Sequence, residues 1–192
     1  MISTLQQLKK ELRIFFPDIS ESCKRCEYPE CKGYITLFEE EIDEFLDLDI
    51  EVVAINEEVY LINNFEEKNG ELNLSEISPK CKLRCANGKC GIHNHKPYIC
   101  LIYPIMIEKY QDGKHYWCFH KLCQYYIDLK KIGKYEEIIF KFKKILKEID
   151  PELKKKIYDY YFKVCSVTVS QYTDTDIDVI KEVKECQNVN RQ

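Results

Sequence analysis

Residues 90–104 read CGIHNHKPYICLIYP. Cys90 and Cys100 enclose two histidines and a Lys-Pro pair, and a Tyr-Pro pair ends the stretch. A segment of this kind is either part of a folded core or one half of a metal site. The choice depends on where the other thiols of the chain lie, because a metal ion needs several ligands around it.

Nine of the 11 cysteines fall into three clusters, since only Cys165 and Cys186 stand apart. The first cluster has the pattern C-x2-C-x4-C, the second C-x3-C-x4-C-x9-C and the third C-x4-C. A two-residue spacing lets two thiolates turn onto one ion. In chain order the clustered residues are Cys23, Cys26 and Cys31, then Cys81, Cys85, Cys90 and Cys100, then Cys118 and Cys123.

The second cluster lies in residues 63–100, where the sequence shows little apolar periodicity. A structureless loop of that length is uncommon in a compact domain, so something other than apolar burial is expected to order it. A structural zinc site contributes an apparent ~10 to 16 kcal/mol to the folding of small peptides, whereas a whole domain is stable by only about 5 to 15 kcal/mol. One metal centre would therefore suffice to order both cysteine-rich segments.

The composition is that of a folded globular protein, with 192 residues of which 45% are hydrophobic and 32% charged. The apolar runs are too short to span a membrane, and the N-terminal residues carry lysines where a signal peptide would be apolar. We therefore expect a cytoplasmic protein that makes no membrane contact. A reducing compartment favours metal binding or catalysis over disulfides as the role of its cysteines.

Helical periodicity dominates the remaining sequence, so we predict a mainly α fold with a small β-hairpin, in which metal-stapled loops pack on a helical bundle. A single domain is expected over residues 1–192, with a metal-binding region at about 20–125 and a helical region at about 134–187. Cys165 and Cys186 are predicted to be core residues, the second of them on a short final helix. The other expected elements are helices at 3–16 and 37–47, the latter with a capping box of Thr36 and Glu39, a hairpin made of EVVAI and VYLI, and helices at 138–149 and 153–164.

The early cysteine cluster, the helix-like ITLFEEEIDEF and the later CKLRCANGKCGIHNHKPYICLIYP together resemble the YkgJ-type cysteine-cluster family, described as a zinc- or iron-chelating domain. The resemblance covers roughly residues 20–125. It implies that both segments ligate one metal centre. The positions that match the family's second segment are Cys81, Gly88 with Cys90, Ile92 with His93, Lys96 with Pro97, and Cys100 with Tyr103 and Pro104.

The sequence departs from the family pattern at three places. Lys32 stands where a doubled cysteine would continue, Leu101 replaces an arginine, and Cys85 is an additional thiol. The predicted ligands are Cys23, Cys26, Cys31, Cys81, Cys90 and Cys100, and Cys85, Cys118 or Cys123 would complete the set.

Thiolate ligation suits either tetrahedral zinc or an iron-sulfur cluster. We favour the cluster, because six or more thiolates exceed the needs of one zinc site and three aromatic residues offer shielding from solvent. The four histidines are expected to lie outside the ligand set. The aromatic residues are Tyr98, Tyr103 and Trp117, and the histidines are His93, His95, His115 and His120.

Three functions fit these patterns. The first is a metal-binding module with a structural or electron-transfer role. The second is an enzyme, because flagellin lysine methylases contain a related cysteine cluster, although the 6 glycines form no cofactor loop after a strand. The third is a zinc-stapled scaffold that binds a protein partner on the lysine-rich helices within residues 130–156. The net charge of -4 argues against general nucleic-acid binding.

Overall fold

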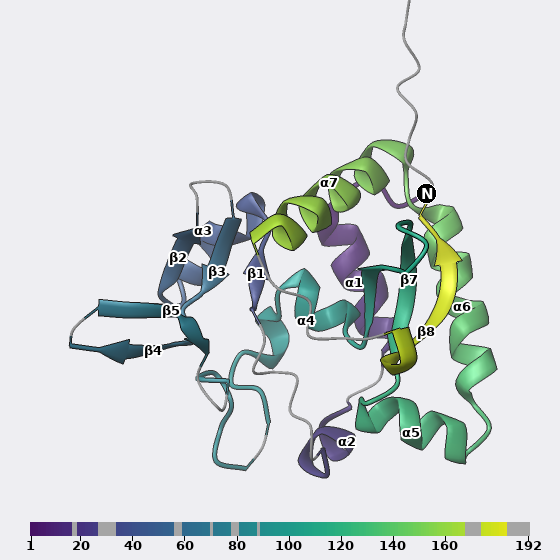
Figure 1. Ribbon diagram of the computed structural model, residues 1–192, viewed down its shortest axis with the longest axis horizontal. Coiled ribbons are helices and arrows are strands. Elements are labelled where there is room, and N and C mark those ends of the chain that lie inside the picture. The colour runs from purple at the N-terminus through teal and green to yellow at the C-terminus, as the bar shows by residue number, and fades with distance from the viewer. Residues whose placement is uncertain are drawn as a thin grey trace, which may run out of the picture. The chain divides into compact units, whose positions relative to one another are not determined.

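The computed structural model describes residues 1–16, 19–26, 34–55, 59–69, 71–77, 81–87, 89–167 and 174–183. The chain divides into two compact units, drawn in Figure 1 and described separately below. The terminal unit comprises Met1–Pro17 and Ile102–Gln192, and the cysteine unit comprises Asp18–Leu101. The cysteine unit is thus a continuous stretch of chain inserted between the two parts of the terminal unit.

The terminal unit contains a three-stranded antiparallel sheet in the order β6-β7-β8. Helices on its flanks complete this unit (Figure 1). The strands are β6 (Ile105–Lys109), β7 (His115–His120) and β8 (Ile177–Glu182), and the helices are α1 (Leu5–Phe15), α5 (Gln124–Lys131), α6 (Tyr135–Glu148), α7 (Pro151–Val167) and the short 3-10 helix η4 (Asp174–Asp176). Within the described ranges, no helix has the length and apolar character needed to cross a bilayer.

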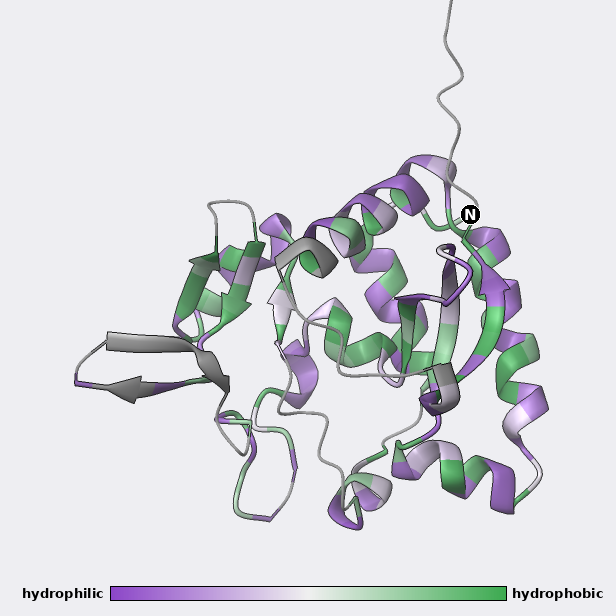
Figure 2. Cartoon of the chain, viewed as in Figure 1, coloured by the Kyte–Doolittle hydropathy of each residue, from purple (hydrophilic) through white to green (hydrophobic). Residues whose placement is uncertain are grey.

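Three helices of the terminal unit, α1, α6 and α7, form where the sequence predicted them, whereas α5 was not predicted. The backbone N–H of Gln7 donates to the Thr4 side chain at 3.2 Å, so that α1 begins with a capped amide. The apolar stripes of α1 and α6 are buried, and Figure 2 shows them as green bands that alternate with polar ones. The predicted pair of helices before and after Pro151 is confirmed as α6 and α7.

Trp117 of β7 lies at the centre of the core of the terminal unit. Its ring meets the rings of Phe142 at 5.5 Å, Tyr161 at 6.1 Å and Tyr158 at 6.5 Å. These edge-on and tilted contacts join the sheet to α6 and α7, and aromatic pairs of this kind are worth about 0.5 to 1.5 kcal/mol beyond their burial. Sheet and helices of this unit therefore share one aromatic core.

The cysteine unit contains a three-stranded antiparallel sheet in the order β1-β3-β2 and a separate two-stranded ribbon. The predicted hairpin is confirmed, because β2 and β3 pair from Val52↔Ile62 to Ile55↔Val59. The strands are β1 (Thr36–Leu37), β2 (Val52–Ile55), β3 (Val59–Ile62), β4 (Phe65–Lys68) and β5 (Glu71–Ile77), and the helices are α2 (Ser20–Lys24), η2 (Glu39–Glu41), α3 (Ile42–Leu46), η3 (His93–His95) and α4 (Tyr98–Ile102).

The prediction of a mainly α fold with one small hairpin is wrong. The protein is mixed α/β, with two three-stranded antiparallel sheets. Strand β7 was missed because HYWCFH is largely buried on both faces, which removes the alternation that marks a half-buried strand, and its short partner β6 was missed with it. The predicted helical region at about 134–187 is interrupted by β8, so a final helix does not begin there; Cys186 itself lies outside the described residues.

Two local predictions also need correction. Residues 63–100 are not a loop throughout, because β4 and β5 form an antiparallel ribbon within them. The expected helix at 37–47 begins later, as η2 followed by α3, and Thr36 lies in β1. The carboxylate that caps this turn is Glu41, which accepts the backbone N–H of Phe38 at 3.1 Å.

Candidate metal centre

The clustered cysteines are divided between the two units. The cysteine unit holds Cys23, Cys26, Cys81, Cys85, Cys90 and Cys100, all present as thiols, and only Cys85 is exposed. Cys118 and Cys123 belong to the terminal unit, where both are buried thiols. The predicted ligand Cys31 lies outside the described residues, as does the Cys165 side chain.

Residues 81–87 and 89–91 form a compact turn, and we call the stretch 81–91 the thiol hairpin. The backbone N–H of Arg84 donates to the Cys81 carbonyl at 2.9 Å, and that of Gly91 donates to the Leu83 carbonyl at 2.8 Å. Arg84 and Cys90 pair as an isolated antiparallel bridge. Glycine suits position 91, because a Cβ there would lie 3.1 Å from the Leu83 carbonyl oxygen, which is a tight contact. These contacts hold three cysteines on a single short turn.

Two thiols of the hairpin influence each other electrically. Burial raises the pKa of the Cys81 thiol above its ordinary value, and the charge of Cys90 raises it further. A backbone hydrogen bond from Leu83 and the charge of Arg84 act in the opposite direction and lower this pKa. The charge of Cys90 therefore disfavours ionisation of Cys81, whereas the Arg84 guanidinium favours it.

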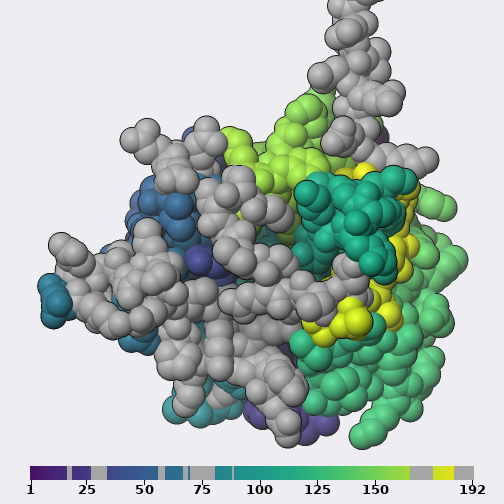
Figure 3. All heavy atoms as spheres, viewed as in Figure 1, coloured from purple at the N-terminus to yellow at the C-terminus, as the bar shows by residue number. Residues whose placement is uncertain are grey.

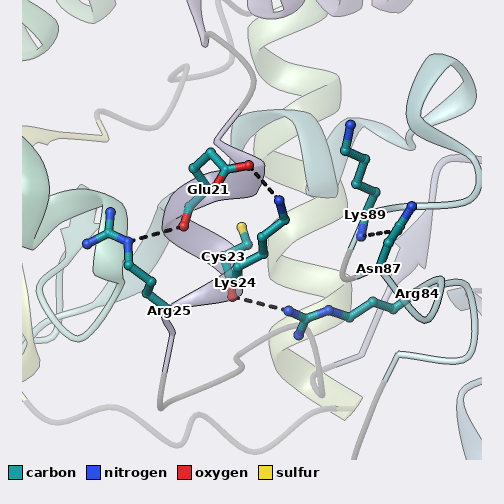
Figure 4. Close-up of polar contacts among 7 residues, drawn as sticks. All are labelled: Glu21, Cys23, Lys24, Arg25, Arg84, Asn87 and Lys89. Atoms are coloured by element: carbon teal, nitrogen blue, oxygen red, sulfur yellow. Dashed lines mark hydrogen bonds and ion pairs between the residues drawn. The ribbon is translucent and has the colours of Figure 1, made fainter.

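Arg84 also joins the first cysteine cluster to the second. Its Nη2 atom donates a hydrogen bond to the backbone carbonyl oxygen of Cys23 at 3.2 Å, as Figure 4 shows. Cys23 lies in α2, a five-residue helix whose Lys24 side chain meets the Glu21 carboxylate at 2.6 Å. The Arg84 side chain, from the second cysteine cluster, thereby contacts the backbone of Cys23 in the first.

Buried polar side chains hold the second cluster against the rest of the cysteine unit. Glu41, 1% exposed, accepts the backbone N–H of Tyr98 at 2.8 Å and so fixes the start of α4, the helix that carries Cys100. Asn64 accepts the backbone N–H of Lys82 at 2.9 Å, directly after Cys81. Both ends of the second cluster are therefore anchored by hydrogen bonds from outside it.

The histidines make contacts of other kinds. The Nδ1 atom of His95 lies 3.1 Å from a Glu44 carboxylate oxygen, and His93 is exposed. In the terminal unit the buried His120 meets Glu108 at 3.1 Å between Nε2 and Oε1. Each of these two imidazoles uses one ring nitrogen in its carboxylate contact, which leaves the second nitrogen for another partner.

Among the residues that the structure describes, no three His, Cys, Asp or Glu side chains gather closely enough to hold a metal ion. The thiol hairpin supplies Cys81 and Cys90, whose charges influence each other, and Cys31 is outside the described ranges. The chemistry of the donors suits a soft metal, because thiolates select zinc, copper(I) and iron-sulfur clusters. The thiol groups present are therefore of the type that such a metal prefers. A complete site would need further ligands from the first cluster or from Cys100.

Sequence reasoning missed the three side chains that anchor the cysteine segments. Arg84 stands between two cysteines, where it was passed over as a spacer, and Asn64 follows a strand without any motif. Glu41 is the only one with a detectable signal, since acidic residues at the third position of a helix commonly cap it. Their partners lie 18 to 61 residues away in the sequence, so no local pattern identifies them.

No protein-family model, curated protein or solved structure matches this chain.

Proposed function

We propose that the cysteine unit is a metal-binding module that holds an iron-sulfur cluster or zinc through thiolates of two segments. The observation that carries the proposal is the hydrogen bond from Arg84 to the Cys23 carbonyl, because it lies between the two cysteine clusters. The resemblance to the YkgJ-type family supports the same pairing of segments. The proposed ligands are Cys23, Cys26, Cys31, Cys81, Cys90 and Cys100.

An iron-sulfur cluster remains our preferred assignment, because six thiols are available where one closed zinc site uses four. Such a cluster would carry electrons or order the loops, whereas zinc would do only the latter. Arg84 would then offset thiolate charge, and Glu41 and Asn64 would keep the second segment in position. A thiolate centre fits a cytoplasmic location, where cysteines stay reduced.

Anaerobic purification followed by elemental analysis, sulfide determination and visible spectroscopy tests this proposal. We expect either iron with sulfide and a brown colour, or stoichiometric zinc without colour. Cys23→Ser and Cys90→Ser should each lower the metal content, and Cys165→Ala, at a cysteine predicted to lie outside the site, should not. A protein without metal after this preparation, or equal loss in all three variants, would contradict the assignment.

A protein partner on the lysine-rich helices is a second candidate function. Lys143, Lys144 and Lys147 share one exposed face of α6 with Phe140, which is 60% exposed. The Lys144 ammonium lies 4.7 Å from the centre of the Phe140 ring. Within the described part of the chain, no carboxylate pairs with these three lysines. The face suits an acidic segment with an apolar side chain.

Fluorescence anisotropy with a labelled peptide of glutamates around one leucine tests this second candidate. The double variant Lys143→Glu with Lys147→Glu should abolish salt-sensitive binding. Lys141→Glu is the matched control, because Lys141 is already paired with Glu137 on the same helix. Equal binding by all three proteins would contradict a docking role for this face.

A further inference from the structure

Asn64 is a buried amide whose side-chain oxygen is hydrogen-bonded within the described part of the chain, whereas its side-chain nitrogen is not. It lies between β3 and β4 and is 2% exposed. Its Oδ1 atom accepts the backbone N–H of Lys82 at 2.9 Å. Its Nδ2 atom is buried, and no hydrogen-bond acceptor meets it among the described residues. A buried donor left in this state costs about 1 to 3 kcal/mol, which calls for a compensating role.

The preceding residue shows that the chain can satisfy a buried amide at this place. Asn63 donates through Nδ2 to the Glu51 carboxylate at 2.5 Å. Its Oδ1 atom accepts the backbone N–H of Phe65 at 3.2 Å. Both polar ends of Asn63 are therefore occupied within the fold, whereas one end of Asn64 is not. Of these two adjacent asparagines, the one with the unmet donor is Asn64, which also holds the thiol hairpin through Lys82.

The unmet donor belongs to an amide that is fixed beside Cys81. The residue bound by Oδ1 is Lys82, the immediate neighbour of Cys81 in the chain. Nδ2 shares its amide carbon with that Oδ1 atom, so the unmet donor belongs to the same amide group that binds the residue next to Cys81. Rotation about the Cα–Cβ bond of Cys81, which is half-buried, moves its sulfur without disturbing the hydrogen bonds of the hairpin backbone.

We propose that Asn64 is a positioning residue whose Nδ2 donates to a ligand sulfur of the metal centre, while its Oδ1 holds the thiol hairpin. The inference rests on the proposed metal-binding function. A metal-bound thiolate is a strong acceptor that carries negative charge, whereas a neutral thiol is a weak one. Binding of the metal would therefore supply the acceptor that Nδ2 lacks, and N–H donors to ligand sulfurs tune the electronic properties of such centres.

Titration of the metal-free protein with Co²⁺ tests the role of Asn64, with Asn64→Asp as the principal variant. Aspartate keeps an acceptor for Lys82 and removes the donor. We expect a loss of Co²⁺ affinity of about 10- to 100-fold, as for other residues that support metal ligands. The sulfur-to-cobalt charge-transfer band should also move to lower energy, because the thiolate donates more strongly without its hydrogen bond. A purely structural role would leave the energy of this band unchanged.

Asn87→Asp is the matched control, since it makes the same chemical change on the thiol hairpin itself, which Asn64 holds from outside. Asn87 accepts the backbone N–H of Lys89 at 3.0 Å, which aspartate preserves, and its side chain is exposed (Figure 4). This variant should keep the affinity and the band of the unmodified protein. It measures the effect of an added charge at an exposed position of the hairpin, whereas the amide signal of Asn64 in the unmodified protein tests the buried donor without any added charge.

A second measurement keeps the test decisive if Asn64→Asp fails to fold. In the ¹⁵N-labelled unmodified protein, the side-chain amide protons of Asn64 should shift downfield when Cd²⁺ is added. Two outcomes would overturn the role of Asn64 alone. In the first, Asn64→Asp changes the Co²⁺ affinity and the band no more than Asn87→Asp does. In the second, Cd²⁺ binds but the amide signal of Asn64 does not shift. Failure of the unmodified protein to bind either metal would overturn the proposed function and this inference together.

Discussion

The Arg84 guanidinium donates a hydrogen bond of 3.2 Å to the backbone carbonyl oxygen of Cys23, which precedes it by 61 residues. The same guanidinium lowers the pKa of Cys81, acting against the effect of burial. The Arg84 side chain thus binds the backbone of the first cysteine cluster, and its positive charge also favours a thiolate in the second cluster. This relationship makes Arg84 the natural first target for mutation.

Replacement of Arg84 by glutamine should weaken metal binding by about 10- to 100-fold, because it removes both the link to Cys23 and the charge that offsets paired thiolates. Competition with a chromophoric chelator measures the affinity. Lys82→Gln serves as control, since it removes an exposed positive charge from the same hairpin while leaving its backbone bond to Asn64 intact. A loss of metal affinity in Lys82→Gln as large as that in Arg84→Gln would show that the positive charge alone matters and the bond to Cys23 does not.

Truncation of Glu41 should destabilise the cysteine unit by about 3 kcal/mol, because Glu41→Ala leaves the buried amides of Phe38 and Tyr98 without their acceptor. Urea unfolding followed by circular dichroism gives the free energy of unfolding. Glu39→Ala, which removes an exposed carboxylate from the same turn, should stay within about 0.5 kcal/mol of the unmodified protein. Similar losses in both variants would argue against the anchoring role.

Phe142→Ala should cost about 3 to 5 kcal/mol of stability, because it leaves a cavity beside Trp117 and Phe15. Phe140→Ala is the matched change on the same helix and should cost far less, since Phe142 is 1% exposed and Phe140 is 60% exposed. Thermal unfolding followed by tryptophan fluorescence measures both. Equal midpoints for the two variants would contradict the position of the aromatic core.

Removal of the metal should loosen the cysteine unit and leave the core of the terminal unit intact. Trp117 is the single tryptophan of the chain and lies in the terminal unit, so its fluorescence reports on that unit alone. A strong chelator should increase proteolysis within residues 81–91 without changing this fluorescence. The opposite pattern, unchanged proteolysis with altered tryptophan emission, would place the metal elsewhere.

The hydrogen bond between Tyr116 and Asp112 should be visible in a titration. The Tyr116 hydroxyl donates to the Asp112 carboxylate at 2.7 Å, which raises the pKa of Tyr116 to about 12 and lowers that of Asp112. Their hairpin lies on the surface of the terminal unit beside β8 (Figure 3). The tyrosine's contribution to stability is present below its unfolded pKa of 10.0 and is lost as the pH rises through about 12.

For Asp112 the sign is reversed, because stability from a lowered carboxyl pKa is present above 3.8 and is lost as the pH falls through the folded value. Asp112→Asn should return the pKa of Tyr116 toward 10.0. Nuclear magnetic resonance of ¹³C-labelled tyrosine, with the signal assigned by Tyr116→Phe, measures the change. An unchanged value would show that the hydrogen bond is absent in solution.

Several elements of the fold follow from local sequence alone. The helix of Leu5–Phe15 and the pair of helices around Pro151 were predicted because their apolar residues recur at helical spacing, which depends only on the helix itself. The β2–β3 hairpin was predicted from local sequence as well, because its two apolar stretches are separated in the sequence only by Asn-Glu-Glu. The clustering of the cysteines is likewise visible in the sequence.

Only the tertiary structure decided how the distant segments combine. Strand β7 pairs with β8 across more than fifty residues, and HYWCFH has no alternation to reveal it, because both of its faces are buried. Arg84 meets Cys23, and Asn64 meets Lys82, through hydrogen bonds whose partners no spacing rule connects. The sequence alone determined which residues carry thiol chemistry and where the three longest helices, α1, α6 and α7, form. The partners of the buried polar groups were decided by long-range packing, because a buried donor or acceptor takes its partner from whatever backbone the fold brings beside it.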